Sequence, residues 1–242
     1  RSCRACSPSS SKSWQTETSI YVPRLEAALR HVTLRPPIPA NIPLGPLDAP
    51  PSLLQSVIHR AATFYELGVW YRTRETMEAI IVLWREGYVS SAAALARLIF
   101  ELWGASHFMT DGLRTFGQHK DIARLAQVVN RLYEGVRSEV LLPWGTPASE
   151  KPIHVLDTIR SLSQTFPDAM AVYETLCESA HANQPRFMEW WFLGKTGDNW
   201  TNETVQSRGH ALIIKTVDAM EKATIGIKTE TEIGMKLCGE LY

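Results

Sequence analysis

The amino-acid sequence predicts an all-α protein, folded as a helical bundle. Apolar residues recur at three- and four-residue spacing over most of the 242 residues, which is the period of an amphipathic helix. Strand and helix patterns do not alternate along the chain, so the sequence does not favour a parallel sheet. A hydrophobic content of 45% is enough to bury a full core. We therefore expect a helical bundle domain over 52–242, preceded over 1–51 by an arm, a short helix and a proline-rich connector.

The N-terminal region is expected to precede the body of the bundle. Residues 1–13 are rich in serine and poor in bulky apolar side chains, which favours a disordered arm. Cys3 and Cys6 form a single CxxC, and because a zinc ribbon needs a second pair, we predict no metal site there. A short helix is expected over 23–32. Residues 35–51 contain seven prolines and should form an extended connector.

The remaining residues are predicted to form consecutive helices with one insert. A long helix is expected over 52–86, stopped by Gly87, either continuous or broken near Gly68. Ser90 or Ser91 should cap the next, central helix, and Gly112 should end it. Further helices are expected over 119–137, 152–164, 165–182, 203–225 and 229–241. Aromatic residues around a GKTGDN turn in 187–202 predict a small hairpin-like or irregular insert.

The central helix contains the strongest candidate site. Its segment 91–109 is apolar or small almost throughout, yet it carries Arg97 and Glu101 one turn apart. A helix that is apolar on nearly all sides is normally buried, and buried charges need partners. We expect both residues in the core, paired with each other or with groups from 168–182. Four small neighbours leave room for a helix or a ligand: Ala93, Ala94, Gly104 and Ala105.

A histidine near the end of the 165–182 helix is the second candidate. Glu174, Glu178 and His181 share one side of this helix, on the margin of its apolar face. His181 there can reach a cleft as a general acid or base, or it can serve as a hydrogen-bonded residue near a helix end. The spacing of Glu178 and His181 also occurs in di-iron bundles, but the sequence lacks the second Glu-x-x-His of such sites, so we predict no metal or other cofactor.

A basic stripe is predicted on the 119–137 helix. Lys120, Arg124, Gln127 and Arg131 lie opposite its apolar side, where they can follow a phosphate backbone or form an ordinary solvated face. The net charge is zero and the pI is about 7.2, so no general basic field attracts nucleic acid. Nucleic-acid binding would therefore depend on this local patch.

Two segments carry a resemblance to a known family. RLIFE (97–101) and YETLCESAHANQPR (173–186) resemble an uncharacterised family of prokaryotic all-helical proteins. That family is similar to the HEPN superfamily of helical ribonucleases and nucleotide-binding proteins, which are frequent in toxin–antitoxin and antiviral-defence loci. The resemblance covers about 55–225 and implies an α-bundle, usually dimeric, with a polar site of Arg97, Glu101 and His181. HEPN ribonucleases carry an Arg followed after four to six residues by a His, and the matches here occur at the chance rate.

Three functions remain open from the sequence. The first is an RNA-binding effector or metal-independent endoribonuclease, in which His181 transfers protons, Arg97 stabilises the charged phosphorane and Glu101 orients one of them. The second is a non-enzymatic interaction or regulatory module in which the same residues form a structural network. The third is a nucleotide or small-molecule sensor. Expected partners are RNA or a nucleotide and a second copy or partner protein, without a membrane. The few cysteines and the lack of a visible signal peptide predict a cytoplasmic location.

Overall fold

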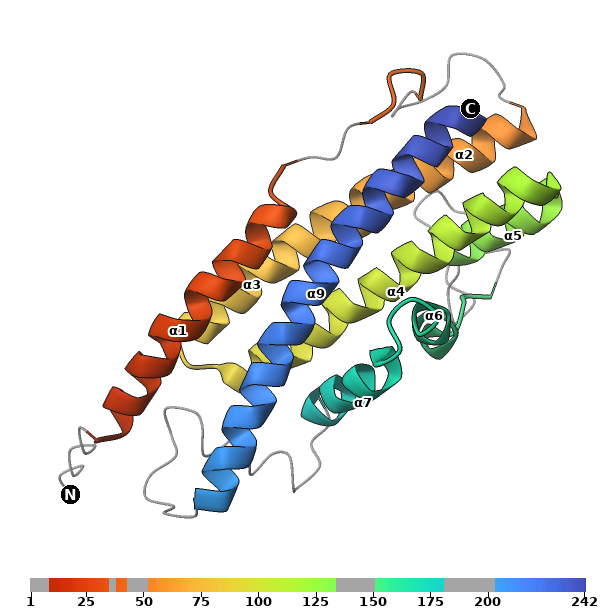
Figure 1. The fold of residues 1–242 in the computed structure, drawn as a ribbon. Coiled ribbons are helices and arrows are strands. Elements are labelled where there is room, and N and C mark those ends of the chain that lie inside the picture. Colours follow the sequence, from red (N-terminus) through yellow and green to blue (C-terminus); the bar gives the residue numbers. More distant parts are fainter. Residues whose placement is uncertain (1–8, 35–37, 43–51, 134–150, 181–202) are drawn as a thin grey trace.

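All secondary structure in the described part of the chain is helical. The computed structural model describes residues 9–34, 38–42, 52–133, 151–180 and 203–242 (Figure 1). Its elements are α1 (Ser9–His31), α2 (Leu53–Thr63), η1 (Phe64–Tyr71), α3 (Arg72–Arg85), α4 (Val89–His119), α5 (Ile122–Tyr133), α6 (Val155–Leu162), α7 (Ala169–Ala180) and α9 (Glu203–Leu241). The predicted all-α bundle is confirmed. The expected insert over 187–202 lies outside the described residues.

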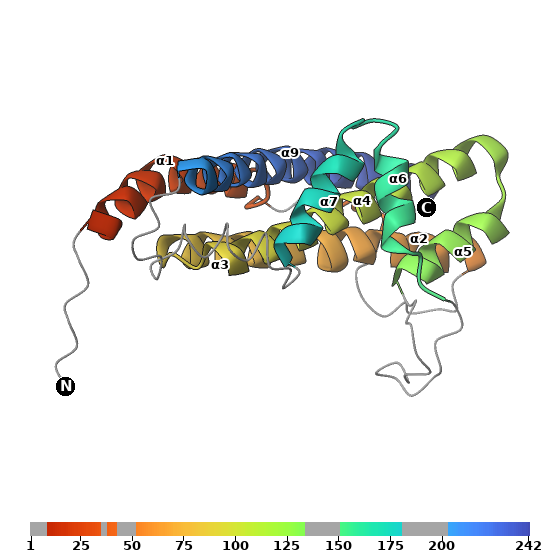
Figure 2. The same cartoon turned by 90° about the horizontal axis from the view of Figure 1, so that it is seen from below.

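The long helices are arranged in two layers with α4 in contact with both. Figure 2 shows α1 and α9 side by side in one layer, and the run from α2 to α3 in the other. α4 packs against α9 and α3, while α6 and α7 cover another side of α4, and α5 turns back to contact α2. No helix in the described ranges is both long and apolar enough to cross a membrane.

The run from α2 to α3 is one continuous helix, as predicted for 52–86. Ser52 and Gln55 form a capping box at its start, and Gly87, with a φ of 80°, follows its end. Of the two alternatives left open at Gly68, the structure shows the continuous one. Gly68 lies in η1, an eight-residue π-helical segment. Such wide turns are rare and occur often at functional sites.

The predicted ends of the central helix are wrong. α4 begins at Val89 without a side-chain cap, so Ser90 and Ser91 lie in its first turn, and it ends at His119 before Lys120 in a left-handed conformation. Gly112 lies inside α4 and does not end it. Because glycine has no side chain, α5 can pack closely against α4 at this position. A Cβ there would lie 3.0 Å from Val128 Cγ1.

The N-terminal helix is longer than predicted. α1 begins at Ser9, so the expected disordered arm is wrong for residues 9–13, and Pro23 lies inside the helix rather than at its start. The described side chains of α1 contribute to the core shared with α3 and α9. Arg24 donates hydrogen bonds to Asp218 and Glu221 of α9, at 2.6 to 2.8 Å. These contacts explain why a helix with an interior proline is stable here.

Helix ends also differ from the predictions in the second half of the chain. α6 begins after His154, whose Nδ1 accepts the Leu156 N–H, and α7 begins at Ala169 rather than near Thr165. The predicted helices 203–225 and 229–241 form the single helix α9. Thr165 does not cap α7, because its hydroxyl donates to the carbonyl of Leu162.

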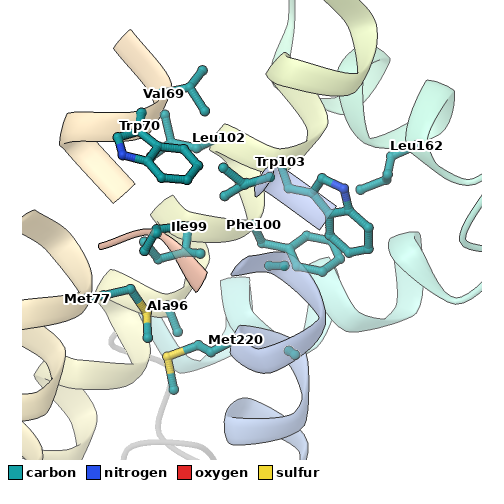
Figure 3. Packing of buried hydrophobic residues seen from close by; sticks show 14 of the residues in the cluster. Val69, Trp70, Met77, Ala96, Ile99, Phe100, Leu102, Trp103, Leu162 and Met220 are labelled. Carbon is teal, nitrogen blue, oxygen red and sulfur yellow. The ribbon is translucent and has the colours of Figure 1, made fainter. Parts of the chain in front are cut away.

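Two glycines of α9 receive aromatic rings from neighbouring helices. A Cβ on Gly226 would lie 2.2 Å from Cε2 of Trp103 in α4, and one on Gly234 would lie 2.2 Å from Cζ of Tyr65 in η1. Figure 3 shows the Trp103 ring beside Phe100, within the core that joins α4 to its neighbours. The two rings therefore leave no space for a side chain at position 226 or 234 of α9.

Candidate functional site

The paired charges of α4 form the centre of the candidate site. Arg97 Nε lies 2.8 Å from Glu101 Oε1, which confirms the predicted pair. The expected core position is wrong, because the two side chains are 32% and 24% exposed. Other helices surround most of α4, but over this pair α7 supplies only partial cover. Arg97→Ala should therefore cost about 1 kcal/mol, as for a solvent-screened pair, and not the roughly 3–5 kcal/mol of a broken buried pair.

Tyr173 of α7 completes the polar site. Its buried hydroxyl donates to Glu101 Oε1 at 3.0 Å, and its ring centroid lies 5.9 Å from Arg97 Cζ, within cation–π range. A residue of the 168–182 region thus forms a hydrogen bond with the Arg97–Glu101 pair, as predicted. Burial, the Cys177 thiol and the Glu101 carboxylate raise the pKa of Tyr173, so it acts here as a neutral hydrogen-bond donor.

The Arg97 guanidinium is a permanent cation with unused donors. The hydrogen bond to Glu101 raises its pKa above the ordinary value. Its Nη1 and Nη2 make no hydrogen bond to another residue in the described ranges. These nitrogens can bind a phosphate or carboxylate from solution. His181, the third predicted member of the site, lies outside the described residues, and Glu174 and Glu178 are exposed on α7.

A groove begins beside Glu101. It has a volume of about 830 Å³ and is bounded by residues of α2, η1, α3, α4, α5, α6 and the segment before α6. We call it the η1 groove. Of the four small residues predicted to leave space near the pair, Ala105 lines this groove. Gly104 instead receives α6, since a Cβ there would lie 3.0 Å from Ile159 Cδ1, and Ala93 is buried.

The structure divides the predicted basic stripe. Lys120 is not part of α5 but follows the end of α4, with its Nζ 5.8 Å from the Phe116 ring centroid. Arg124 is exposed and lines a cavity of about 370 Å³, and Asp111 and Asp121 line the same cavity. Arg131 Nε donates to the carbonyl of Lys151 at 3.1 Å. Two of the three cations therefore already have local contacts.

The sequence analysis missed a polar cluster inside the bundle. His107 Nδ1 of α4 lies 2.8 Å from Glu230 Oε1 of α9, and both residues are buried. Nearby, the Tyr65 hydroxyl and Thr110 Oγ1 are 2.8 Å apart. Burial acts to raise the pKa of Glu230, but the hydrogen bonds with His107 and Thr110 and the charge of Arg114 lower it overall. The only sequence signal is the shared helix face of His107 and Thr110.

The buried cluster has the character of a structural link between helices. Glu230 Oε2 and Thr231 Oγ1 are buried without a hydrogen-bond partner in the described part of the chain. Within those same ranges, no group of three or more His, Cys, Asp or Glu side chains is arranged to hold a metal ion. The partly exposed Arg97 site is thus the better candidate for contact with a partner.

Comparisons with known proteins add no assignment to this geometry: no family model, curated protein or solved structure matches the chain.

Proposed function

We propose that this protein is a HEPN-like helical effector, of the defence or toxin–antitoxin type, that binds RNA at the site formed by Arg97, Glu101 and Tyr173. The observation that supports this proposal is the solvent access of the Arg97–Glu101 pair. A purely structural pair inside a helical core would be sealed by its neighbours. Arg97 instead keeps its terminal nitrogens available for an anion.

Each residue has a defined role in the proposed binding. Arg97 contacts a backbone phosphate through its terminal nitrogens, because a guanidinium matches phosphate geometry and stays charged. Glu101 fixes the guanidinium through Nε. Tyr173 positions Glu101 in turn, through the hydrogen bond to Oε1. Lys120, Arg124 and Arg131 are proposed as outlying phosphate contacts, of which Arg124 is the most accessible.

RNA cleavage without a metal is the enzymatic form of this proposal. The ribose 2′-oxygen would attack the neighbouring phosphorus while His181 accepts its proton. The bond to the 5′-oxygen would then break, and that oxygen would leave with a proton from solvent. Arg97 would stabilise the negative charge of the phosphorane. This form requires His181→Ala to abolish cleavage while RNA binding persists.

The binding test compares two similar ion pairs. Fluorescence anisotropy with a labelled single-stranded RNA is measured at several salt concentrations for the wild type, Arg97→Gln and Arg74→Gln. Arg74 pairs with Glu78 on α3 with the same i, i+4 spacing and a 3.0 Å Nε–Oε1 distance. We expect Arg97→Gln to weaken binding about tenfold and to reduce the salt slope by about one, whereas Arg74→Gln binds normally.

Two results would refute the proposal. One is a wild type that does not retain RNA at low ionic strength. The other is equal loss in the Arg97 and Arg74 variants, which would indicate general surface charge. A triple alanine variant of Lys120, Arg124 and Arg131 tests the outlying contacts, and should fold normally yet lose salt-sensitive binding.

A structural network is the second candidate function for the same residues. It is favoured by the two hydrogen bonds that Glu101 Oε1 accepts, one from α4 itself and one from α7. In that case Tyr173→Phe should lower the melting temperature without any RNA affinity to lose. Homodimer formation and a cytoplasmic location stay predictions of the sequence. Sedimentation of the purified chain tests the first, and fractionation of the source cells tests the second.

A further inference from the structure

About half of the wall of the η1 groove is apolar, and the groove is open to solvent. Leu67 of η1 is 57% exposed and Tyr133 at the end of α5 is 38% exposed, and both line the groove. Phe64, Leu98 and Ile153 add further apolar surface. A concave surface that combines exposed apolar side chains with a few polar groups is typical of binding sites rather than of ordinary protein exterior. Its volume of about 830 Å³ lies in the range of small-molecule pockets.

One cation at the groove lacks a counter-ion among the residues that the structure describes. Arg72, the first residue of α3, is exposed and lines the groove. In the described ranges, no carboxylate forms an ion pair with its guanidinium. The other charged residue of the lining, Glu101, is already neutralised by Arg97. Among its described lining residues, the groove therefore offers a single uncompensated positive charge beside apolar side chains.

The π-helical turn helps to form this groove. Several lining residues of the groove come from the end of α2, from η1 and from the start of α3: Thr63, Phe64, Leu67, Gly68 and Arg72. At Gly68 the nearest groups to a Cβ would be atoms of the Phe64 ring, at 3.3 Å, so a larger residue there would press on this wall. The rare π-helical segment thus contributes to the wall of the groove as well as to the core.

We propose that the η1 groove binds an amphiphilic monoanion: a carboxylate or sulfonate carried on an apolar, partly aromatic body. The anionic head contacts Arg72, and the body lies against Leu67, Phe64 and Tyr133. A polyanion such as RNA is disfavoured inside the groove, because one cation faces it and a carboxylate lies in its wall. This site is separate from the Arg97 phosphate contact and does not depend on RNA binding.

Two fluorescent probes of nearly identical shape test this assignment. 8-Anilinonaphthalene-1-sulfonate carries the proposed anionic head, and N-phenyl-1-naphthylamine has the same aromatic body without it. Both are titrated into the folded protein and followed by their emission. We expect the wild type to bind the sulfonate about tenfold more tightly than the neutral probe, as for one added charged hydrogen bond.

Matched variants assign the binding to the groove. Arg72→Ala should weaken the sulfonate about tenfold and leave the neutral probe unchanged. Arg74→Ala, a nearby exposed residue of α3 that does not line the groove, should leave both affinities as in the wild type. Ala105→Phe should fill part of the groove and weaken both probes. Because Ala105 is half-buried, the exposed Leu67→Asp serves as a second blocking variant, and melting curves confirm that each variant is folded.

Several results would overturn the proposal. Absence of probe binding by the wild type would remove the site. Equal sulfonate affinity in the wild type and Arg72→Ala, or equal loss in Arg72→Ala and Arg74→Ala, would show that Arg72 does not hold the anion. Undiminished binding in folded Ala105→Phe and Leu67→Asp would place the probes elsewhere. None of these results would bear on RNA binding at Arg97.

Discussion

Replacing Gly234 with alanine should destabilise the protein although alanine is the better helix former. The added Cβ would lie 2.2 to 2.5 Å from three atoms of the Tyr65 side chain. Tyr65 is fully buried, so its ring has little space to move aside. Overpacking of this kind costs about 1–3 kcal/mol. Displacement of the ring also weakens the 2.8 Å hydrogen bond to Thr110, a further loss of about 1 kcal/mol.

The gain in helix propensity offsets part of this loss. Alanine is favoured over glycine inside a helix by about 1 kcal/mol, which leaves a net destabilisation of about 2 kcal/mol. For a chain of this size the melting temperature should fall by roughly 4–8 °C. The change is measured by thermal unfolding followed by circular dichroism and by urea denaturation of the same samples.

Gly117 provides the control. It is exposed on α4, and nothing lies within 4 Å of the position that its Cβ would take. Gly117→Ala should therefore stabilise the protein, by up to about 1 kcal/mol. A Gly234→Ala variant as stable as the wild type would refute the close packing of Tyr65 on α9. Equal losses in the two variants would refute the assignment of the effect to that contact.

Three further predictions follow from the charged and buried groups. Arg97→Ala should lower stability by about 1 kcal/mol in thermal unfolding, and a loss above 3 kcal/mol would mean that the pair with Glu101 is buried after all. Because the pKa of Glu230 is lowered from 4.5 in the fold, its stabilising contribution is present above that pH and disappears as the pH falls through the lowered value. The acid-induced drop in melting temperature should thus be smaller in Glu230→Gln than in the wild type, and identical drops would contradict this. Burial raises the pKa of Cys238 to about 12, so Cys238→Ala should leave the number of thiols that react with Ellman's reagent unchanged before unfolding and reduce it by one afterwards.

The helices could be predicted from the sequence better than their ends. Apolar periodicity located the helical segments because it reports which side of a helix is buried. Gly112 and Pro23 were expected as boundaries on local grounds, since both residues disfavour helix interiors. In the fold, Gly112 admits Val128 of α5, and α1 is held to α9 by Arg24. Contacts between helices thus override the local preference, and no local pattern reports them.

The candidate site was predictable as a pair but not as a surface. Isolation of Arg97 and Glu101 in an apolar helix indicated that they pair. Their exposure depends on how much of α4 is covered by α7, which lies far along the chain. The Tyr173 contact spans 72 residues and the His107–Glu230 contact spans 123. Separations of this size leave no trace in helical spacing.

The two glycines of α9 that receive Trp103 and Tyr65 restrict how the bundle can move. Gly226 and Gly234 are eight residues apart, or about 12 Å along the helix axis, and each holds a ring from a different neighbour. A slide of α9 by one turn would bring larger side chains against both rings at once. The packing of these two rings at Gly226 and Gly234 therefore opposes translation of α9 along its axis. A signal crossing this bundle would have to travel by bending or by local melting of helices, and not by a piston-like shift of α9.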